Sequence, residues 1–280
     1  MNDKKTKISV FATYWNEKNW IEASLAQIDA INPHEVIICD GCFDPSKPNY
    51  STDGTREIIE KWVEGQPTAR MISASRHSKI GGLFYIFGKK IKFRLLPVRV
   101  LMFFYYLHTN IYRINQAATF NKMSRMSKFW KPGNWFMTLD ADQFYPDEMI
   151  EKFKQICDTK ETTVDLITAS EMTFFKNFNE FTTEYDKRNY NNMPHRIKKY
   201  TLIVPTRDIV VEKYPRPKAY GKDPSIRKQD VGSYFHYKFR LKDQSRTKVG
   251  NTLGDRKDVD SSRFSYKKFK DTHPTVIRNS

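Results

Sequence analysis

Short apolar runs alternate with amphipathic stretches in the N-terminal part of the chain. The β-prone run at 7–13 is followed by apolar residues at helical spacing over 20–31, and Asn32-Pro33 then ends that helix. A second apolar run covers 35–40, and a second helix is predicted at 56–63. Strands and helices in this order predict an α/β fold, with a mostly parallel sheet and right-handed crossovers.

The same alternation resumes further along the chain. The elements expected there are a helix at 115–126, a strand at 135–140, a helix from Pro146, and strands at 164–169, 200–204 and around 232–239. The strands at 35–40 and 135–140 both end in an acid, Asp40 and Asp140. Ligands of such sheets bind at the carboxyl ends of the strands, so both acids are expected near a ligand.

The segment 73–112 interrupts the alternation. Its apolar body at 95–107 is too short, and too interrupted by Arg99, to span a bilayer, which needs about 20 apolar residues. A basic flank and aromatic content suit a helix that lies in a membrane interface. A core helix with a basic exposed end, or a subunit contact, explains the same pattern. We expect one domain over 1–250 that carries this insertion, followed by a basic tail at 251–280.

The distribution of charge is more informative than its total. The net charge is +16, and no acidic residue occurs between Glu64 and Asp140, whereas 13 Lys and Arg do. A solvated basic surface is the simple explanation. A gap this long favours an anionic partner instead: nucleotide phosphates, an anionic lipid surface or nucleic acid.

The three cysteines predict no disulfide framework. Cys39 and Cys42 form a C-x-x-C pair, but no second pair or spaced histidines accompany it, so buried thiols are expected. The charged N-terminus at 1–5 leads directly into a strand and does not resemble a secretory signal. A cytoplasmic protein is expected, with the inner face of the membrane as a candidate peripheral location.

A D-x-D motif, Asp140-Ala141-Asp142, follows the strand at 135–140. This spacing places two carboxylates on the same side of an extended backbone, close enough to share one divalent ion. A hard cation held there can neutralise a nucleotide diphosphate as a leaving group. The alternative is a pair of surface acids that cap the helix beginning at Pro146.

Four segments occur in a characteristic order: 11–17, then 36–41 with 51–55, then 139–144, then 236–240 with 248–250. In this order the chain resembles family-2-type glycosyltransferases of the GT-A fold, in a branch with an Asp-x-Asp-Glu-Phe motif and a C-terminal His-Tyr element. Two departures stand out. Residues 42–50 enlarge the loop after Asp40, and Gln143 replaces the usual Glu.

The resemblance implies an enzyme that uses Mn²⁺ or Mg²⁺ and a nucleotide-diphosphate sugar as donor, with a UDP-sugar favoured. It also implies roles for several residues. The implied roles are base and ribose contacts by Thr13, Asn16, Glu17 and Asp40, ribose and metal contacts by Asp140, metal ligation by Asp142, and a third ligand or diphosphate contact by His236. Without the resemblance, a lone His among aromatics is more typical of a core residue. Imidazole ligation favours manganese.

Basic residues near the C-terminus and two carboxylates complete the candidate site. Arg240, Arg246 and Lys248 could clamp phosphate oxygens, or could simply belong to the basic tail. An inverting transferase needs a carboxylate base at the acceptor hydroxyl, and Asp230 and Glu171 are the candidates. Either could instead be a structural cap or a salt-bridge partner.

The D-x-D motif and the resemblance together predict a metal-dependent glycosyltransferase, and the resemblance implies a hexosyltransferase-like enzyme that inverts the anomeric carbon. Its expected acceptor is a glycan or a lipid-linked glycan in surface polysaccharide synthesis. A nucleotidyltransferase that makes nucleotide sugars is one alternative, although the segment 14–17 lacks the Gly-rich basic loop of that class. A basic nucleic-acid-binding protein is another. That alternative leaves the strand-end acids unexplained, so no nucleic-acid partner is expected.

Overall fold

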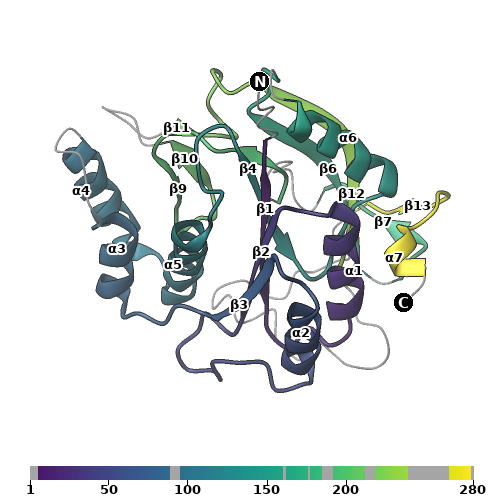
Figure 1. The fold of residues 1–280 in the computed structure, drawn as a ribbon, viewed down its shortest axis with the longest axis horizontal. Helices are drawn as coiled ribbons and strands as arrows, with labels where there is room; N and C mark the ends of the chain where they lie inside the picture. The colour runs from purple at the N-terminus through teal and green to yellow at the C-terminus, as the bar shows by residue number, and fades with distance from the viewer. Residues whose placement is uncertain are drawn as a thin grey trace.

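The computed structural model describes residues 6–88, 95–159, 162–175, 177–184, 192–211, 218–238 and 265–278. A central sheet lies between helices (Figure 1). Its eight strands run in the order β3-β2-β1-β4-β8-β6-β12-β5. They are β1 (Ile8–Tyr14), β2 (Glu35–Asp40), β3 (Ala69–Ser73), β4 (Trp135–Asp140), β5 (Gln143–Phe144), β6 (Leu166–Phe174), β8 (His195–Arg196) and β12 (Lys228–Tyr237).

The remaining elements surround this sheet. The helices are α1 (Ile21–Ile31), α2 (Thr55–Glu64), α3 (Lys79–Phe87), α4 (Leu96–Tyr105), the 3-10 helix η2 (Tyr106–His108), α5 (Ile111–Met126), α6 (Asp147–Asp158) and α7 (Thr275–Arg278). The two small sheets contain β9 (Thr201–Ile203), β10 (Ile209–Val211) and β11 (Lys218–Ala219), and β7 (Glu180–Phe181) with β13 (Lys267–Lys268).

The predicted α/β fold class is confirmed. Strands β3, β2, β1 and β4 are parallel to one another, and β12 is parallel to β6. The short strands β8 and β5 run antiparallel to their neighbours. The sheet is therefore mostly parallel, with its antiparallel pairs confined to two-residue strands.

Helices cover both faces of the sheet, which explains why its strands are apolar almost throughout. Side chains of β1 alternate between two core clusters: Val10 and Ala12 pack with α1 and α6, whereas Phe11 packs with α5. Burial on both faces produces the continuous apolar runs seen in the sequence.

Several predicted elements differ in their bounds. Helix α5 begins at Ile111, four residues before the predicted start, because the Asn110 side chain accepts a hydrogen bond from the Arg113 backbone N–H at 3.0 Å. Strand β6 continues to Phe174, and β12 begins at Lys228. Strands β3, β5, β7, β8, β10, β11 and β13 were not predicted, since short strands depend on their neighbours more than on local propensity.

The insertion at 73–112 forms α3, α4 and η2. Their inner residues share a third core cluster with α5 and with the sheet of β9, β10 and β11. Within the described ranges, no helix combines the length and apolar character needed to cross a membrane. Part of the expected tail packs onto the domain: β13 pairs with β7, and Ile277 is 8% exposed.

Gly41, directly after Asp40, is required where the loop 42–50 returns to the sheet. Its φ is +141°, and a Cβ atom there would overlap the carbonyl oxygen of Asn49. Gly232 has a similar φ of +121° but has open space around it. Backbone strain alone costs about 1–3 kcal/mol at either site.

We therefore expect Gly41→Ala to reduce the free energy of unfolding by roughly 2 kcal/mol more than the control Gly232→Ala. The excess arises because the loop must move away from its own backbone. Urea denaturation of the two variants measures this difference. Equal losses would show that the loop does not constrain Gly41.

Candidate active site

The carboxyl ends of β1, β2 and β4 meet at one edge of the sheet. Tyr14 at the end of β1 is opposite Asp40 of β2, and Thr13 is opposite Asp140 of β4. Both strand-end acids therefore flank the end of β1, where ligands of parallel sheets bind.

Asp40 lies inside this edge rather than on its surface. Its side chain is 1% exposed and accepts hydrogen bonds from the Ser51 hydroxyl at 2.6 Å and the Ser51 N–H at 3.2 Å. Arg56 lies 3.4 Å from the second oxygen. Burial raises the pKa of the Asp40 carboxyl above its ordinary value, although Ser51 and Arg56 act in the opposite direction. Since Ser51 follows the enlarged loop, these bonds anchor the far end of that loop.

The turn after β1 is bonded to the segment that leads into α2. The Asn16 N–H donates to the Ser51 hydroxyl at 2.9 Å, and its side-chain oxygen accepts from the Thr52 N–H at 2.8 Å. The Glu17 N–H donates to the Thr55 hydroxyl at 2.8 Å. Asn16 has a φ of 54°, a left-handed conformation in which Asn is enriched. The first two segments of the sequence resemblance are thus in direct contact.

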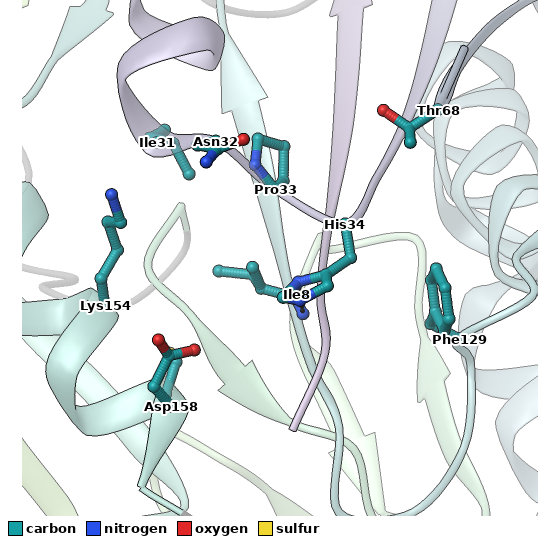
Figure 2. A pocket seen from close by; sticks show the side chains of 10 residues that line it. Ile8, Ile31, Asn32, Pro33, His34, Thr68, Phe129, Lys154 and Asp158 are labelled. Carbon is teal, nitrogen blue, oxygen red and sulfur yellow. Dashed lines mark hydrogen bonds between the residues drawn. The ribbon is translucent and has the colours of Figure 1, made fainter. Parts of the chain in front are cut away.

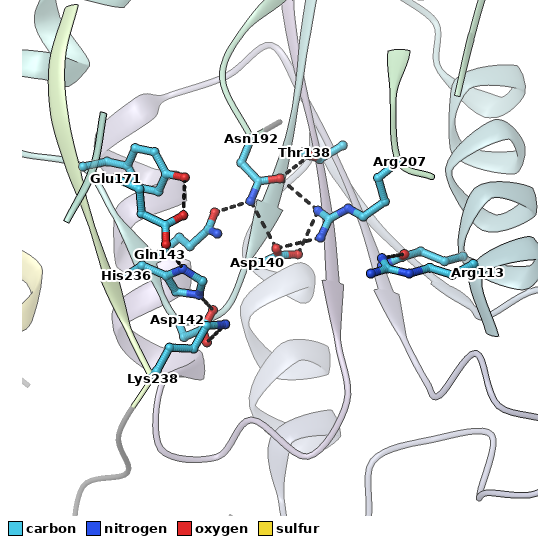
Figure 3. A network of polar contacts seen from close by, with 12 residues as sticks. Arg113, Thr138, Asp140, Asp142, Gln143, Glu171, Asn192, Arg207, His236 and Lys238 are labelled. Atoms are coloured by element: carbon cyan, nitrogen blue, oxygen red, sulfur yellow. Dashed lines mark hydrogen bonds and ion pairs between the residues drawn. The ribbon is translucent and has the colours of Figure 1, made fainter. Parts of the chain in front are cut away.

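Asp140 forms a bidentate ion pair with Arg207, which lies in the turn between β9 and β10 (Figure 3). The two guanidinium nitrogens lie 2.9 and 3.1 Å from the two carboxylate oxygens. The Asn192 amide donates to Asp140 at 3.1 Å. Burial acts to raise the pKa of Asp140, but Arg207 and Asn192 hold it below its ordinary value. Asp140 is therefore a charged carboxylate, with a side chain that is 25% exposed.

The amide of Gln143 fits the position where the resemblance expects a Glu. Its side-chain oxygen accepts from the same Asn192 amide that donates to Asp140. The Asn192 oxygen in turn accepts from Thr138 at 2.7 Å and from Arg207 at 2.9 Å. A carboxylate at residue 143 would add a second negative charge beside Asp140, and the neutral amide avoids it.

Asp142, His236 and Glu171 form a buried chain (Figure 3). One ring nitrogen of His236, Nδ1, lies 2.8 Å from Glu171, and the other, Nε2, lies 3.2 Å from Asp142. Burial acts to raise the pKa of Glu171, but the His236 charge and three hydrogen-bond donors lower it to about 2. Burial acts to lower the pKa of His236, and the two carboxylates outweigh it and raise that pKa.

Alternate residues at the end of β12 and directly after it supply the partners of this buried chain. The Tyr234 hydroxyl donates to Glu171 at 2.7 Å, His236 contacts both acids, and the Lys238 ammonium lies 3.2 Å from Asp142. Residues two apart on a strand point to the same face, so Tyr234 and His236 of β12, and Lys238 directly after it, point toward one place. Strand β5 pairs with β12 and begins directly after Asp142, so the pairing holds the end of the D-x-D segment beside β12.

The remaining predicted residues do not all lie at this site. Asp230 is six residues before His236 on β12, about 20 Å along the strand, where it accepts from Thr168 and the Gly232 N–H. Glu171 is at the site, but it is 4% exposed and accepts from Thr173, Tyr234 and His236. Arg240, Arg246 and Lys248 lie outside the described residues.

Sequence reasoning missed Arg207 and Asn192 and gave no role to Lys238. The position of Lys238, two residues after His236 on a predicted strand, could have indicated that both face the same way. Arg207 and Asn192 lie in irregular segments and reach Asp140 only through tertiary packing. No local pattern in the sequence identifies them.

Some of the side chains at this edge are suited to bind a divalent metal ion. Glu171 holds Nδ1 of His236, so Nε2 faces Asp142, which is how a carboxylate commonly orients a ligating histidine. Asp140 is already engaged by Arg207, and Lys238 lies where a cation would meet Asp142. In the part of the chain that the structure describes, no group of three His, Cys, Asp or Glu is arranged to hold a metal ion. Asp142 and His236 are thus the two side chains that fit, and diphosphate oxygens would have to complete the set.

A cavity of about 580 Å³ lies at the opposite edge of the sheet (Figure 2). It is lined by residues around the start of β1, the end of α1 and the end of α6, including Ile8, Pro33 and Lys154. Because it lies at the amino ends of the strands, it does not adjoin the acidic edge.

The chain is similar to several glycosyltransferases of known structure, but no family model and no curated protein match it. A mannosyltransferase from Pyrobaculum calidifontis, solved with GDP-Man and Mn²⁺, is 18% identical, with a TM-score of 0.35. That match covers 60% of this chain and only 36% of the mannosyltransferase.

Glucosyl-3-phosphoglycerate synthase from Mycobacterium tuberculosis, solved with Mn²⁺, UDP and glucosyl-3-phosphoglycerate, is 14% identical, with a TM-score of 0.39. The same enzyme solved with phosphoglyceric acid is 12% identical, with a TM-score of 0.42. Both matches cover 89% of this chain and 76% of the synthase. These TM-scores are too low to assign an activity.

A double-mutant cycle on Asp140 and Arg207 tests the ion pair at the edge of the site. We expect Arg207→Met alone to destabilise the protein by about 1–3 kcal/mol, because it leaves a partly buried carboxylate without its main partner. Asp140→Asn combined with Arg207→Met should lose less than the sum of the single changes, by about 1 kcal/mol. Chemical denaturation of the four proteins measures the coupling, and strictly additive losses would contradict it.

Proposed function

We propose that the protein is a metal-dependent glycosyltransferase that takes a sugar from a nucleotide-diphosphate donor. The observation that carries the proposal is the contact between Asp142 and His236 at the carboxyl edge, beside the Asp140–Arg207 pair. Carboxylates and an imidazole suit a divalent ion, and Arg and Lys suit phosphate oxygens. Metal-binding and phosphate-binding side chains occur together at this edge. A nucleotide diphosphate with a bound metal ion requires both.

We assign the following roles at this edge. Asp142 and His236 would hold the ion, and Glu171 positions His236 through Nδ1. Arg207 and Lys238 would bind the diphosphate. The ion would neutralise charge on the leaving diphosphate. The imidazole favours Mn²⁺ over Mg²⁺.

The nucleoside would lie against the turn after β1. Thr13, Asn16 and Glu17 border that turn, and the sequence resemblance gives them base and ribose contacts, with UDP as the favoured nucleotide. We propose that Asp40 acts mainly by anchoring Ser51, because its side chain is 1% exposed. Ser51 in turn fixes Asn16.

Neither carboxylate predicted as the acceptor base fits that role. Asp230 lies far along β12, and Glu171 is buried and held by three donors. Hexosyl transfer with inversion, and a glycan or lipid-linked acceptor in surface polysaccharide synthesis, are proposed on the resemblance alone. A cytoplasmic location is proposed because all three cysteines are buried free thiols, as suits a reducing compartment.

Two other functions explain fewer of these contacts. A nucleic-acid-binding protein that uses no metal leaves Asp140 and Asp142 at this edge unexplained, because carboxylates repel phosphate groups. A nucleotidyltransferase needs a Gly-rich basic loop after the first strand, and Trp15, Asn16 and Glu17 occupy that place.

A thermal-shift screen of nucleoside diphosphates and nucleotide sugars with Mn²⁺ tests the proposal. Ligand at about 100 times its Kd should stabilise the wild type by about 2.7 kcal/mol, a shift of roughly 5 °C for a domain of this size. Asp142→Asn should remove the shift, because it weakens the proposed metal ligand. The matched control is Asp230→Asn, on the same strand as His236 but remote from the site, and it should keep the shift.

Two results would count against the transferase. One is a negative outcome of the screen: no nucleoside diphosphate stabilises the wild type, so that Asp142→Asn has no shift to remove. The other is salt-sensitive binding of oligonucleotides without metal, which would favour the nucleic-acid alternative.

A further inference from the structure

Helices α3 and α4 expose an apolar surface to solvent. We call it the outer apolar face, and its members are Ile80, Phe84, Leu96, Val100, Leu101, Phe104 and Tyr105. Their exposed fractions range from 41% for Leu96 to 72% for Tyr105. Scattered exposed apolar residues are normal, but a contiguous group on two neighbouring helices indicates an interaction surface.

The two helices contribute to one continuous surface. Phe84 of α3 packs against Phe103 of α4, with ring centroids 4.9 Å apart, and Phe103 packs against Phe104 at 5.7 Å. The helices lie side by side at the margin of the molecule, separated from the sheet by α5 (Figure 1).

The outer side of α4 is unusual for a surface helix. Its exposed positions are Leu96, Pro97, Val100, Leu101, Phe104 and Tyr105, which carry no charge. The opposite side buries Val98 and Met102 in the core. A helix of a soluble domain normally has charged or polar residues on the side away from the core. The inner side of α4 already packs into the core. The apolar residues on its outer side therefore need another explanation.

The basic residues next to the outer apolar face in the sequence indicate which kind of partner it binds. Lys79 is exposed at the start of α3, and the connection from Gly88 to Leu95, outside the described residues, contains Lys89, Lys90, Lys92 and Arg94. No acid occurs anywhere between Glu64 and Asp140. An apolar face with basic residues in the adjoining sequence matches an anionic lipid surface, where apolar side chains enter the acyl boundary and cations meet the headgroups.

We propose that the outer apolar face docks the protein onto an anionic membrane surface, with α3 and α4 lying in the plane of the interface. A second copy of the chain is a poorer occupant, since each copy has a net charge of +16 and like charges repel. The inference stands apart from the proposed transferase activity, because lipid binding can be measured without a donor.

Cosedimentation of the full chain with lipid vesicles tests the proposal. We expect binding to vesicles of phosphatidylcholine mixed with phosphatidylglycerol to exceed binding to phosphatidylcholine alone by at least about tenfold, and to weaken as salt is raised. The double variant Leu101→Ser/Phe104→Ser should lose about tenfold or more in affinity, because two side chains that are each 61% exposed no longer enter the interface.

The matched control is Tyr50→Ser/Met126→Ser, which removes two exposed apolar side chains from other parts of the surface. It should bind vesicles like the wild type, and unchanged circular dichroism would show that both double variants are folded. Equal binding to neutral and anionic vesicles, or full binding by Leu101→Ser/Phe104→Ser, would overturn the proposal. If the wild type binds no vesicles and forms a dimer that Leu101→Ser/Phe104→Ser dissociates, the face is an interface between copies and the proposal is overturned.

Discussion

The antiparallel pairing of β5 with β12 is the interaction on which the site depends. The Tyr237 N–H donates to the Asp142 carbonyl at 2.8 Å, and His236 lies opposite Gln143. This pairing joins Asp142 to Lys238, which are 96 residues apart in the chain. Without this pairing, the D-x-D segment would still follow β4, but the Asp142 carboxylate would lack its partners His236 and Lys238.

The same pairing makes an electrostatic balance possible. Each acid at the edge has a cationic partner: Arg207 for Asp140, and His236 with Lys238 for Asp142. Buried charges are costly unless they are paired, so these contacts allow carboxylates to stay ionised in a largely buried edge. In the proposed function, the divalent ion would replace the Lys238 ammonium at Asp142, and the diphosphate would engage the ammonium that is released.

Local patterns predicted the regular half of the molecule well. Strand 135–140 and the helix at 20–31 follow directly from apolar periodicity, and the strand-end positions of Asp40 and Asp140 follow from the parallel order. The contact of Asp142 with His236 was suggested by the family resemblance, not by spacing. The partners Arg207 and Asn192 could not be predicted, because they depend on how irregular segments pack rather than on any periodic signal.

The most direct test of the account is a crystal structure of the protein with a nucleoside diphosphate and Mn²⁺, using the anomalous signal of manganese. We expect a manganese peak between Asp142 and His236 at the carboxyl edge, with the diphosphate beside Arg207 and with Lys238 moved away from Asp142. A nucleotide bound elsewhere, or a manganese peak remote from Asp142 and His236, would contradict it.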